Sequence, residues 1–505
     1  MDMEHPKRFA GTAPDRPAVV IGDRTVSYAE LEARSNQLAH ALRSLGLEVG
    51  SHLAVLMENR SEYFEVVWAG LRSGLLVTPI NWHLSAAEAE YIVADCGATA
   101  LVASAPRADI AAAIDAPALK VRLAVGGPID GFVPYEETVA AHPTSPIGDE
   151  CEGNWMFYSS GTTGRPKGIT PATVGGPLGE PTGFTAMVRF LFGGDESTVY
   201  LSPAPFYHAA PLGWATAIHR IGGTVVAVER FDAGEFLGLI ERHRVTLAQV
   251  VPTHLVRLLK LPEADRARFD LSSLRTLVHA AAPCPPEVKR AVLEWLGPVV
   301  HEYYSGSEGI GFCVIGPEEW LAHPGSVGKS MLGPVHIVGE DGNELPPRSE
   351  GRVYFESPNG FAYHGDPEKT AGAFNEKGWG TFGEIGWVDE EGYLYLTDRA
   401  SNMIISGGVN IYPREIEDAL ILHPSVADVV VIGVPDAEMG ESVRAVVQPV
   451  TPPADSAALE EELIEFVRER IARYKAPRSV VFLPELPRLL TGKVARRLLP
   501  PEATR

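Results

Sequence analysis

The sequence predicts an α/β fold of layered sheets covered by helices, followed by a small α+β domain at the C-terminus. Strand-length apolar runs alternate with helical patterns over residues 28–296, a rhythm typical of largely parallel sheets. Short β segments punctuated by Gly and Asp-Gly fill residues 329–396, which predicts a small antiparallel, β-barrel-like unit. A fresh helix–strand pattern begins after Arg399. These observations predict several packed layers rather than a bundle or a sandwich.

The first elements follow from the spacing of apolar residues. Leucine and alanine at helical spacing predict a helix over residues 28–45, with Ser27 as its N-cap. Apolar runs at residues 53–57 and 75–80 predict strands, and a helical pattern over residues 63–71 lies between them. The result is a β-α-β rhythm.

The same alternation continues along the chain. It predicts strands at residues 199–201, 224–228, 247–251 and 274–278, and helices at 254–261 and 286–296. Beyond Arg399 it predicts helices over residues 413–422 and 458–474, with strands over 426–432 and 479–483. We place a domain boundary near residues 398–402, which gives an N-terminal domain of residues 1–398 and a mobile C-terminal domain of residues 399–505.

Composition limits the class of protein. The chain of 505 residues exceeds what one hydrophobic core usually spans. Its net charge of −22 disfavours a nucleic-acid partner but leaves room for a nucleotide held by a few amides and lysines. The four cysteines are far apart, which argues against a zinc site or a disulfide framework. With no signal-like N-terminus and no 18-residue apolar run, we expect no transmembrane segment and a cytoplasmic enzyme.

A loop rich in glycine and hydroxyl groups, Tyr158-Ser159-Ser160-Gly161-Thr162-Thr163-Gly164-Arg165-Pro166-Lys167-Gly168, is the sharpest local signal. Its glycines permit tight turns, while its hydroxyls, amides and Lys167 suit phosphate oxygens. Taken alone, such a loop is more often plain surface. It is not a Walker P-loop, because Pro166 occupies the position where that motif requires glycine.

Several motifs in order, from Ser27-Tyr28-Ala29-Glu30-Leu31 to Thr491-Gly492-Lys493, resemble the adenylate-forming superfamily of acyl-CoA synthetases, luciferases and peptide-synthetase adenylation domains. Within that superfamily, the sequence most resembles the bacterial fatty-acyl-CoA ligases. The resemblance implies ATP, Mg²⁺ and coenzyme A as cofactors, and it implies that the glycine-rich loop holds the β- and γ-phosphates. Lys493 would be the catalytic lysine, delivered by the mobile domain.

The resemblance also implies how the nucleotide is held. The segment from Tyr303 to Gly309 resembles Y-G-x-T-E, in which the tyrosine stacks on adenine and the glutamate, here Glu308, holds magnesium. Glu384 stands where the family has the aspartate that binds both ribose hydroxyls, and Phe382 stands where it has threonine. The implied ATP- or AMP-binding residues are Ser159, Ser160, Gly161, Thr162, Thr163, Gly164, Lys167, Ala281, Ala282, Pro283, Tyr303, Tyr304, Ser305, Gly306, Ser307, Glu384 and Arg399.

Other implied sites concern the acid and the thiol. Pro205-Phe206-Tyr207-His208 resembles the family's P-x-x-H segment at the acyl pocket. The implied acyl-pocket residues are Tyr207, His208, His279, Ala280 and Gly309. The implied coenzyme A residues are Ser406, Gly407, Gly408, Tyr474 and Arg478, with Ser401 as the hinge. The implied catalytic residues are Lys493, Glu308, Thr163 and His208.

The predicted reaction is activation of a carboxylic acid as acyl-AMP with release of pyrophosphate, followed by transfer of the acyl group to coenzyme A. The predicted acid is fatty or a related hydrophobic acid. Two alternatives stay open. The first is an adenylating enzyme that transfers the acyl group to a carrier protein. The second is a catalytically inactive nucleotide-binding protein, suggested by Phe382 and Glu384. The absence of a G-x-S-x-G motif weakens a hydrolase interpretation. Many family members dimerise, so a homodimer also stays open.

Overall fold

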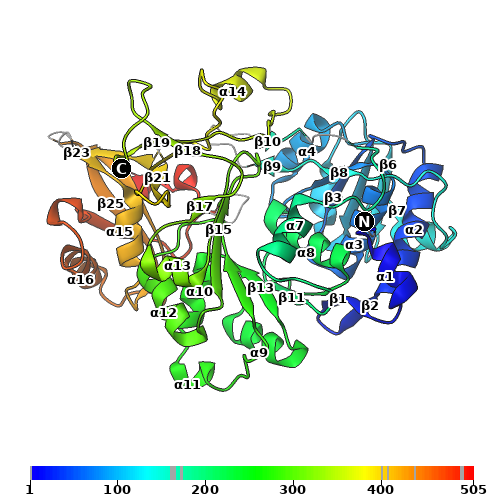
Figure 1. Ribbon diagram of the computed structural model, residues 1–505, viewed down its shortest axis with the longest axis horizontal. Helices are drawn as coiled ribbons and strands as arrows, with labels where there is room; N and C mark the ends of the chain where they lie inside the picture. The colour runs from blue at the N-terminus through cyan, green and yellow to red at the C-terminus, as the bar shows by residue number, and fades with distance from the viewer. Residues whose placement is uncertain are drawn as a thin grey trace. The chain divides into compact units, whose positions relative to one another are not determined.

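The structure is a computed structural model that describes residues 3–159, 166–170, 174–399, 402–406, 409–436, 439–488 and 494–504 (Figure 1). The chain packs as two compact units. The first comprises Met1–Val250, Glu263–Val278 and Phe361–Pro367, and the second comprises Val251–Pro262, His279–Gly360 and Glu368–Arg505. This division follows packing and leaves the domain boundary near residues 398–402 as a prediction.

The first unit contains a parallel sheet with the strand order β7-β6-β5-β3-β4-β8. Its strands are β3 (His52–Leu56), β4 (Leu76–Pro79), β5 (Ala100–Ser104), β6 (Val121–Val125), β7 (Val133–Pro134) and β8 (Asn154–Trp155). Every residue of β5 is buried, as expected for a parallel strand covered on both faces. Figure 1 draws these strands in blue to cyan.

A second run of strands in this unit has the order β14-β13-β11-β12-β1-β2. Its strands are β1 (Pro17–Ile21), β2 (Arg24–Ser27), β11 (Val199–Ser202), β12 (Thr224–Ala227), β13 (Leu247–Val250) and β14 (Thr276–His279). The pairings of β1 with β12, β12 with β11, and β11 with β13 are parallel, whereas β1 and β2 are antiparallel.

Helices cover both runs of strands in the first unit. They are α1 (Pro6–Thr12), α2 (Tyr28–Ser44), α3 (Ser61–Arg72), α4 (Ala86–Asp95), α5 (Ala108–Ala113), α6 (Tyr135–Ala140), α7 (Gly183–Phe190), α8 (Ala209–Ile221), α9 (Ala233–His243) and α11 (Glu263–Arg266). The predicted N-cap of α2 is confirmed, because the Ser27 hydroxyl accepts a hydrogen bond from the Glu30 amide at 3.2 Å.

The second unit begins with antiparallel strands. β15 (Val300–Ser305), β16 (Phe312–Ile315) and β17 (Lys329–Ser330) pair in that order. An antiparallel sheet follows, made of β18 (Val335–Val338), β19 (Gly351–Phe355), β20 (Glu384–Val388) and β21 (Leu394–Arg399). The helices here are α10 (Pro252–Leu259), α12 (Pro286–Leu296), α13 (Pro317–Ala322) and α14 (Pro367–Gly372). The antiparallel strands predicted for residues 329–396 are therefore present.

The C-terminal part of the second unit has its own sheet and core. Its strands are β22 (Ile404–Ser406), β23 (Val409–Ile411), β24 (Val426–Asp436), β25 (Gly440–Pro449) and β26 (Ser479–Phe482). Its helices are α15 (Pro413–Leu420), α16 (Ser456–Arg468) and α17 (Pro501–Thr504). Fully buried side chains of α15, α16 and the central strands, such as Ile416, Leu463 and Val431, form one apolar cluster.

The α/β class predicted from the sequence is confirmed, and most predicted elements agree with the observed ones within a few residues. The helix predicted over residues 286–296 is α12. The helix predicted over residues 458–474 is too long, because α16 ends at Arg468 and only a short 3₁₀ turn, Arg473–Lys475, follows. The buried apolar stripe of the helix does not continue to Tyr474, which is 60% exposed.

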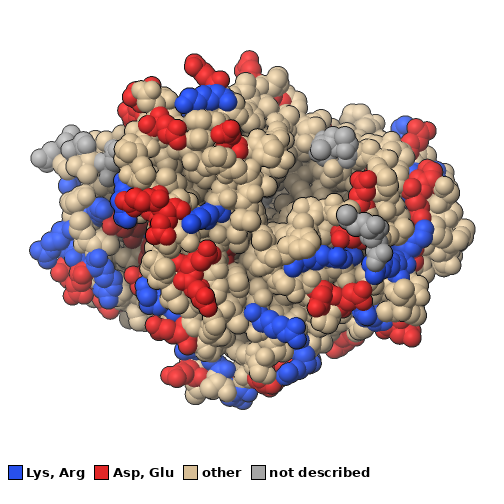
Figure 2. Space-filling view, viewed as in Figure 1, with Lys and Arg blue, Asp and Glu red and all other residues tan. Residues whose placement is uncertain are grey.

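The surface carries charges of both signs. Figure 2 shows Lys and Arg side chains interspersed with Asp and Glu side chains over the face that it presents. None of the helices in the described part of the chain combines the length and the apolar character needed to cross a bilayer.

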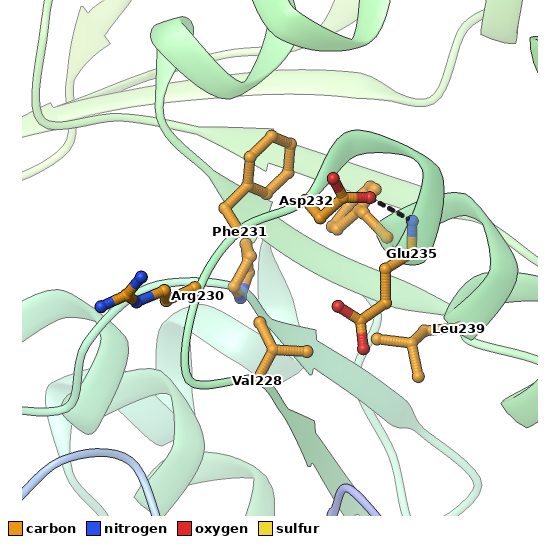
Figure 3. Close-up of a pocket in the computed structure, with 8 residues that line it drawn as sticks. Val228, Arg230, Phe231, Asp232, Glu235 and Leu239 are labelled. Atoms are coloured by element: carbon orange, nitrogen blue, oxygen red, sulfur yellow. Dashed lines mark hydrogen bonds between the residues drawn. The ribbon is translucent and has the colours of Figure 1, made fainter.

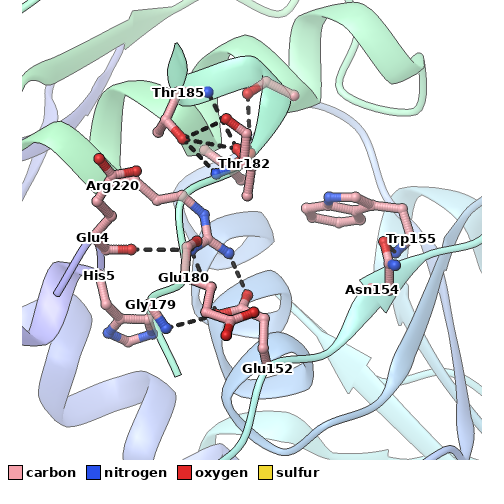
Figure 4. A network of polar contacts seen from close by, with 12 residues as sticks. Glu4, His5, Glu152, Asn154, Trp155, Gly179, Glu180, Thr182, Thr185 and Arg220 are labelled. Carbon is pink, nitrogen blue, oxygen red and sulfur yellow. Dashed lines mark hydrogen bonds and ion pairs between the residues drawn. The ribbon is translucent and has the colours of Figure 1, made fainter. Parts of the chain in front are cut away.

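Arg220 of α8 is the centre of a buried polar network in the first unit (Figure 4). Its guanidinium pairs with the Glu152 carboxylate and donates to the carbonyl oxygens of Glu4 at 3.0 Å and Glu180 at 3.4 Å. Glu152 also accepts a hydrogen bond from the Gly179 amide at 2.8 Å. The Arg220 side chain is only 5% exposed, so its charge is tolerated because it is paired. The network ties the N-terminal residues to the segment around Gly179.

Replacing Arg220 by leucine is expected to lower the free energy of unfolding by about 3–5 kcal/mol, because Glu152 would keep an unpaired buried charge. The double variant Arg220→Leu/Glu152→Leu is expected to regain much of that loss, since neither charge remains. Urea denaturation followed by tryptophan fluorescence measures both effects.

Arg268→Leu supplies the matched control, since Arg268 pairs with Asp265 at 3.4 Å on the surface and is 75% exposed. Its loss is expected to stay below about 1 kcal/mol. A loss in Arg220→Leu no larger than in Arg268→Leu would contradict the proposed importance of the buried network.

Candidate active site

The described ends of the glycine-rich loop form a hairpin in the first unit. β9 (Tyr158–Ser159) and β10 (Lys167–Gly168) pair antiparallel, with Lys167 opposite Ser159 and Gly168 opposite Tyr158. A Cβ atom at Gly168 would lie 2.6 Å from the Met156 methyl group and 3.0 Å from the Tyr158 ring, so a larger residue there would displace the Met156 side chain. The predicted phosphate residues Ser160, Gly161, Thr162, Thr163 and Gly164 lie outside the described residues.

The hairpin is anchored to α4 by a hydrogen bond. The Tyr158 hydroxyl donates to the Asp95 carboxylate at 2.6 Å. Burial, and then this hydrogen bond, raise the pKa of Tyr158 far above its ordinary value, so the hydroxyl remains a donor. The base of the loop is therefore fixed from one side.

A segment distant in sequence also contacts the hairpin and the residues that follow it. The Thr170 amide donates to the Ala362 carbonyl at 2.9 Å, and the His364 amide donates to the Gly168 carbonyl at 2.8 Å. The ammonium group of Lys167 lies 2.7 Å from the Asp366 carboxylate, with 19% of the lysine side chain exposed. The predicted phosphate lysine is therefore paired with a carboxylate from this segment.

The predicted acyl-wall residues Tyr207 and His208 lie before α8, with His208 as its N-cap residue. The Tyr207 ring meets the Trp82 ring edge-on at 6.4 Å, and burial raises the pKa of Tyr207 above its ordinary range. Asn59 fixes the backbone just before them: its amide nitrogen donates to the Ala204 carbonyl at 3.1 Å, and its amide oxygen accepts from the Phe206 amide at 2.9 Å.

Asn59 was missed by the sequence reasoning. A polar side chain three residues after the end of the apolar strand β3 was the available signal, because the ends of parallel strands often carry site residues.

The predicted adenine segment lies at the end of β15 in the second unit. Successive strand residues point to opposite faces. Tyr303 is 7% exposed and stacks on Phe312 at 5.7 Å, whereas Tyr304 is only partly buried. Tyr304 is therefore the more accessible ring of the two. The Ser305 hydroxyl donates to the Gly311 carbonyl at 2.7 Å and holds the following turn.

Glu384 at the start of β20 meets this segment directly. Its carboxylate accepts a hydrogen bond from the Tyr304 hydroxyl at 2.9 Å. The Phe382 ring lies edge-on to Tyr304 at 5.8 Å. A Cβ at Gly306 would come within 2.4 Å of Phe382 and 2.7 Å of a Glu308 oxygen, so these side chains crowd one small volume. The structure thus brings together the predicted residues Tyr304, Gly306, Glu308 and Glu384.

The donor set suits magnesium held jointly with phosphate. No group of three or more His, Cys, Asp or Glu side chains able to hold a metal occurs in the described ranges. Mg²⁺ needs only one or two protein carboxylates when phosphate oxygens and water complete its octahedron. Glu308, partly buried beside Gly306, fits that requirement.

His279 at the end of β14 lies in a buried charged cluster of the second unit. Lys289 of α12 pairs with Glu302 of β15 at 2.6 Å, and the His279 ring nitrogen lies 3.4 Å from the same carboxylate. Burial is the main cause that lowers the pKa of His279 to about 3, so the ring is neutral. Burial opposes ionisation of Glu302, but the Lys289 ammonium group outweighs it and lowers the pKa of that carboxyl.

The residues after His279 form an exposed strand end. Ala280 is buried, Ala281 and Pro283 are exposed, and Ala282 is intermediate. Ala281 has a backbone φ of 71°, in the left-handed region that costs an alanine about 1–2 kcal/mol. A strained residue thus lies at the predicted edge of the adenine and acyl sites. Of the other predicted residues here, Ser307 is exposed and Gly309 has a φ of 68°.

The predicted hinge region is tied to α15. The Asp398 carboxylate accepts hydrogen bonds from the Asn402 side chain at 3.0 Å and from the Arg414 amide at 3.2 Å. The backbone of Arg399 lies opposite Glu384 in the β20–β21 pairing. The hinge residue Ser401 lies outside the described residues.

The predicted thiol-side residues are spread over the C-terminal sheet. Ser406 is buried in β22, whereas Tyr474 is 60% exposed. Arg478 is 54% exposed and lies 3.6 Å from Asp436. Gly407 and Gly408 lie outside the described residues, as does Lys493. Arg488 and Val494, which flank the segment containing Lys493, form an isolated β-bridge.

A hollow of about 150 Å³ in the first unit contains none of these residues (Figure 3). It is lined by Pro203, Val228, Arg230, Phe231, Asp232, Glu235, Phe236 and Leu239. The Asp232 carboxylate of this hollow is engaged in capping α9.

Comparison with known proteins shows which family the chain resembles. Residues 6–362 match the family model described as AMP-binding enzyme, and residues 415–493 match the model described as AMP-binding enzyme C-terminal domain. Among curated relatives, a feruloyl-CoA synthase of Amycolatopsis sp is 36% identical, covering 97% of this chain and 98% of that protein.

Other relatives are similar over nearly their whole length. An indoleacetate–CoA ligase of Aromatoleum aromaticum is 34% identical over 97% of this chain and 95% of its own. The long-chain-fatty-acid–CoA ligase FadD13 of Mycobacterium tuberculosis is 32% identical over 94% of this chain and 93% of its own.

A solved structure shares the fold. The anthranilate CoA ligase AuaEII in complex with anthranoyl-AMP matches with a TM-score of 0.83 and 26% identity, covering 99% of this chain and 96% of that one. The family models together match most of the chain, and the resemblance inferred from its motifs is confirmed. The chain belongs to the AMP-binding enzyme family, the adenylate-forming enzymes.

Proposed function

We propose that this chain is an ATP-dependent, AMP-forming acid–thiol ligase that converts a carboxylic acid to acyl-AMP and then to its coenzyme A thioester. One observation carries the proposal: Tyr304, Gly306, Glu308 and Glu384, drawn from two separate motifs, gather around the end of β15. The family match over residues 6–362 and 415–493 supports the same activity.

The first half-reaction joins two anions. The substrate carboxylate attacks the α-phosphorus of ATP and pyrophosphate leaves, so charge repulsion and positioning dominate the barrier. Lys167 supplies a positive charge at the base of the phosphate loop, and Lys493 would supply another at the reacting phosphate. Magnesium, when bound, neutralises phosphate charge, and Glu308 would hold it. No general base is needed, because the attacking carboxylate is already ionised.

In the second half-reaction a thiol attacks the acyl carbon and AMP leaves. We propose that coenzyme A is the thiol and that a carrier-protein thiol is the alternative to be tested. The exposed Tyr474 and Arg478 suit a large anionic cosubstrate, because an aromatic face and a guanidinium can contact its adenine and phosphates. We further propose that the C-terminal domain turns about Ser401 between the two half-reactions. We also propose that the enzyme works in the cytoplasm.

The acid is proposed to be hydrophobic, either fatty or ring-bearing. The relatives are named for feruloyl, indoleacetate and long-chain fatty substrates, which share an apolar body and one activated carboxylate. The aromatic Tyr207 and Trp82 in the first unit suit such a body.

Purified protein given ATP, magnesium and a panel of aryl, arylacetic and fatty acids is expected to release pyrophosphate with at least one acid. Addition of coenzyme A is expected to yield the corresponding thioester by mass spectrometry. Acyl-AMP that accumulates without thioester would contradict coenzyme A as acceptor. No pyrophosphate with any acid would contradict the ligase function itself.

Lys493→Ala is expected to lower adenylate formation by about a hundredfold or more, because a charge at the reacting phosphate is lost. Thioester formation from supplied acyl-AMP is expected to stay near the original rate, since that step does not use this lysine. Single-turnover assays of each half-reaction measure the split. Equal losses in both half-reactions would contradict domain alternation.

Asp366→Asn is expected to lower the KM for ATP by about threefold, because Asp366 no longer competes with phosphate for Lys167. Lys167→Met is expected to raise that KM, since the phosphate loses a cationic partner. Steady-state pyrophosphate release measures both values. A raised KM in Asp366→Asn would instead indicate that the carboxylate orients Lys167 for ATP.

A further inference from the structure

The contact between Tyr304 and Glu384 links two sheets of the second unit. Tyr304 is the last residue but one of β15, and Glu384 begins β20, 80 residues later. The hydroxyl–carboxylate distance of 2.9 Å is that of a hydrogen bond to an ionised acceptor. A tyrosine held at its hydroxyl cannot swing about χ1, so the direction of its side chain is set, whereas the plane of its ring depends on what packs beside it.

A second contact sets the same ring from its side. The Phe382 ring meets Tyr304 at 5.8 Å with an interplanar angle of 87°, and Phe355 meets Tyr304 at 6.2 Å. Edge-on packing of this kind is favourable and directional. The hydrogen bond from Glu384 and the edge-on contact of Phe382 come from residues only two apart in the chain. One short segment therefore holds both the ring edge and the hydroxyl group of Tyr304.

Gly306 makes room for this arrangement. A Cβ atom there would lie 2.4 Å from the Phe382 ring, a distance that side chains do not tolerate. Phenylalanine at position 382 and glycine at position 306 therefore belong together. The same Cβ would also lie 2.7 Å from the Glu308 carboxylate, so Phe382 packs beside the proposed magnesium ligand as well.

The length of the side chain at position 384 matters for the hydrogen bond. Aspartate is shorter than glutamate by one methylene, or about 1.5 Å. From the same backbone position an aspartate carboxylate would lie well beyond hydrogen-bond distance of the Tyr304 hydroxyl. The glutamate and the phenylalanine, both departures from the family pattern, thus act on one aromatic ring.

We propose that Glu384 is a positioning residue for Tyr304: through this hydrogen bond, and with Phe382 packed on the ring edge, it fixes the aromatic face that receives the adenine base. The inference rests on the proposed function, since it assumes that ATP binds at the end of β15. It differs from the ribose role implied by the family motif, because here the carboxylate acts through a tyrosine. It follows that aspartate, the usual residue of the family, is the worse choice in this chain.

A double-mutant cycle tests the proposal on the full-length protein. The dissociation constant for ATP is measured by calorimetry for the wild type, Glu384→Asp, Tyr304→Phe and the double variant, with unfolding temperatures recorded alongside. Each single variant is expected to weaken ATP binding by about tenfold, the effect of losing a hydrogen bond to a charged group. The double variant is expected to be no weaker than either single one, because all three lose the same contact.

Two further variants separate positioning from a general structural effect. Glu384→Gln keeps the reach and can accept the same hydrogen bond, so it is expected to bind ATP more tightly than Glu384→Asp. Tyr393→Phe is the matched control, since Tyr393 donates to Glu319 at 3.1 Å elsewhere in the second unit. It is expected to leave ATP binding unchanged.

The outcomes are distinct. If Glu384→Asp binds ATP as tightly as the wild type, or if the two single effects multiply in the double variant, the positioning role is overturned while the ligase proposal stands. If the wild type binds no ATP, the proposed function fails, and the inference fails with it.

Discussion

Glu302 is a carboxylate inside the second unit, and the strand that carries the candidate nucleotide residues depends on how its charge is balanced. A lone ion at that depth would cost several kcal/mol, so the ammonium group of Lys289 from α12 is needed beside it, and the neutral ring of His279 from β14 lies 3.4 Å from the same carboxylate. The three residues come from three elements and meet at one point. They fix β15 between its neighbours, two residues before Tyr304.

Beyond Glu302, successive side chains of β15 point to opposite faces of the sheet. Tyr303 points into the core against Phe312, and Tyr304 points toward Glu384. In the first unit the phosphate hairpin is fixed in a comparable way, with Asp95 holding Tyr158 and the segment of residues 361–366 holding β10 and Lys167. In each unit, candidate site residues thus lie on a strand that side-chain hydrogen bonds or ion pairs tie to a neighbouring segment.

The sequence was sufficient for the fold class, for most helices and strands, and for the motifs, because these depend on local spacing and on residue types at short range. α12 and the N-cap of α2 agree with their predictions for that reason. The observed end of α16 differs from its prediction, because it depends on where the apolar side chains of the helix no longer pack against the core. Pairs such as Lys167 with Asp366 join residues 199 positions apart, and no local pattern encodes them. The roles of Ser401, Gly408 and Lys493 remain predictions.

The left-handed backbone of Ala281 bears on how this enzyme can diverge. Glycine would adopt that geometry without strain, whereas a bulky or β-branched side chain would meet an added cost there. Natural drift at this exposed rim is therefore biased toward opening it rather than narrowing it.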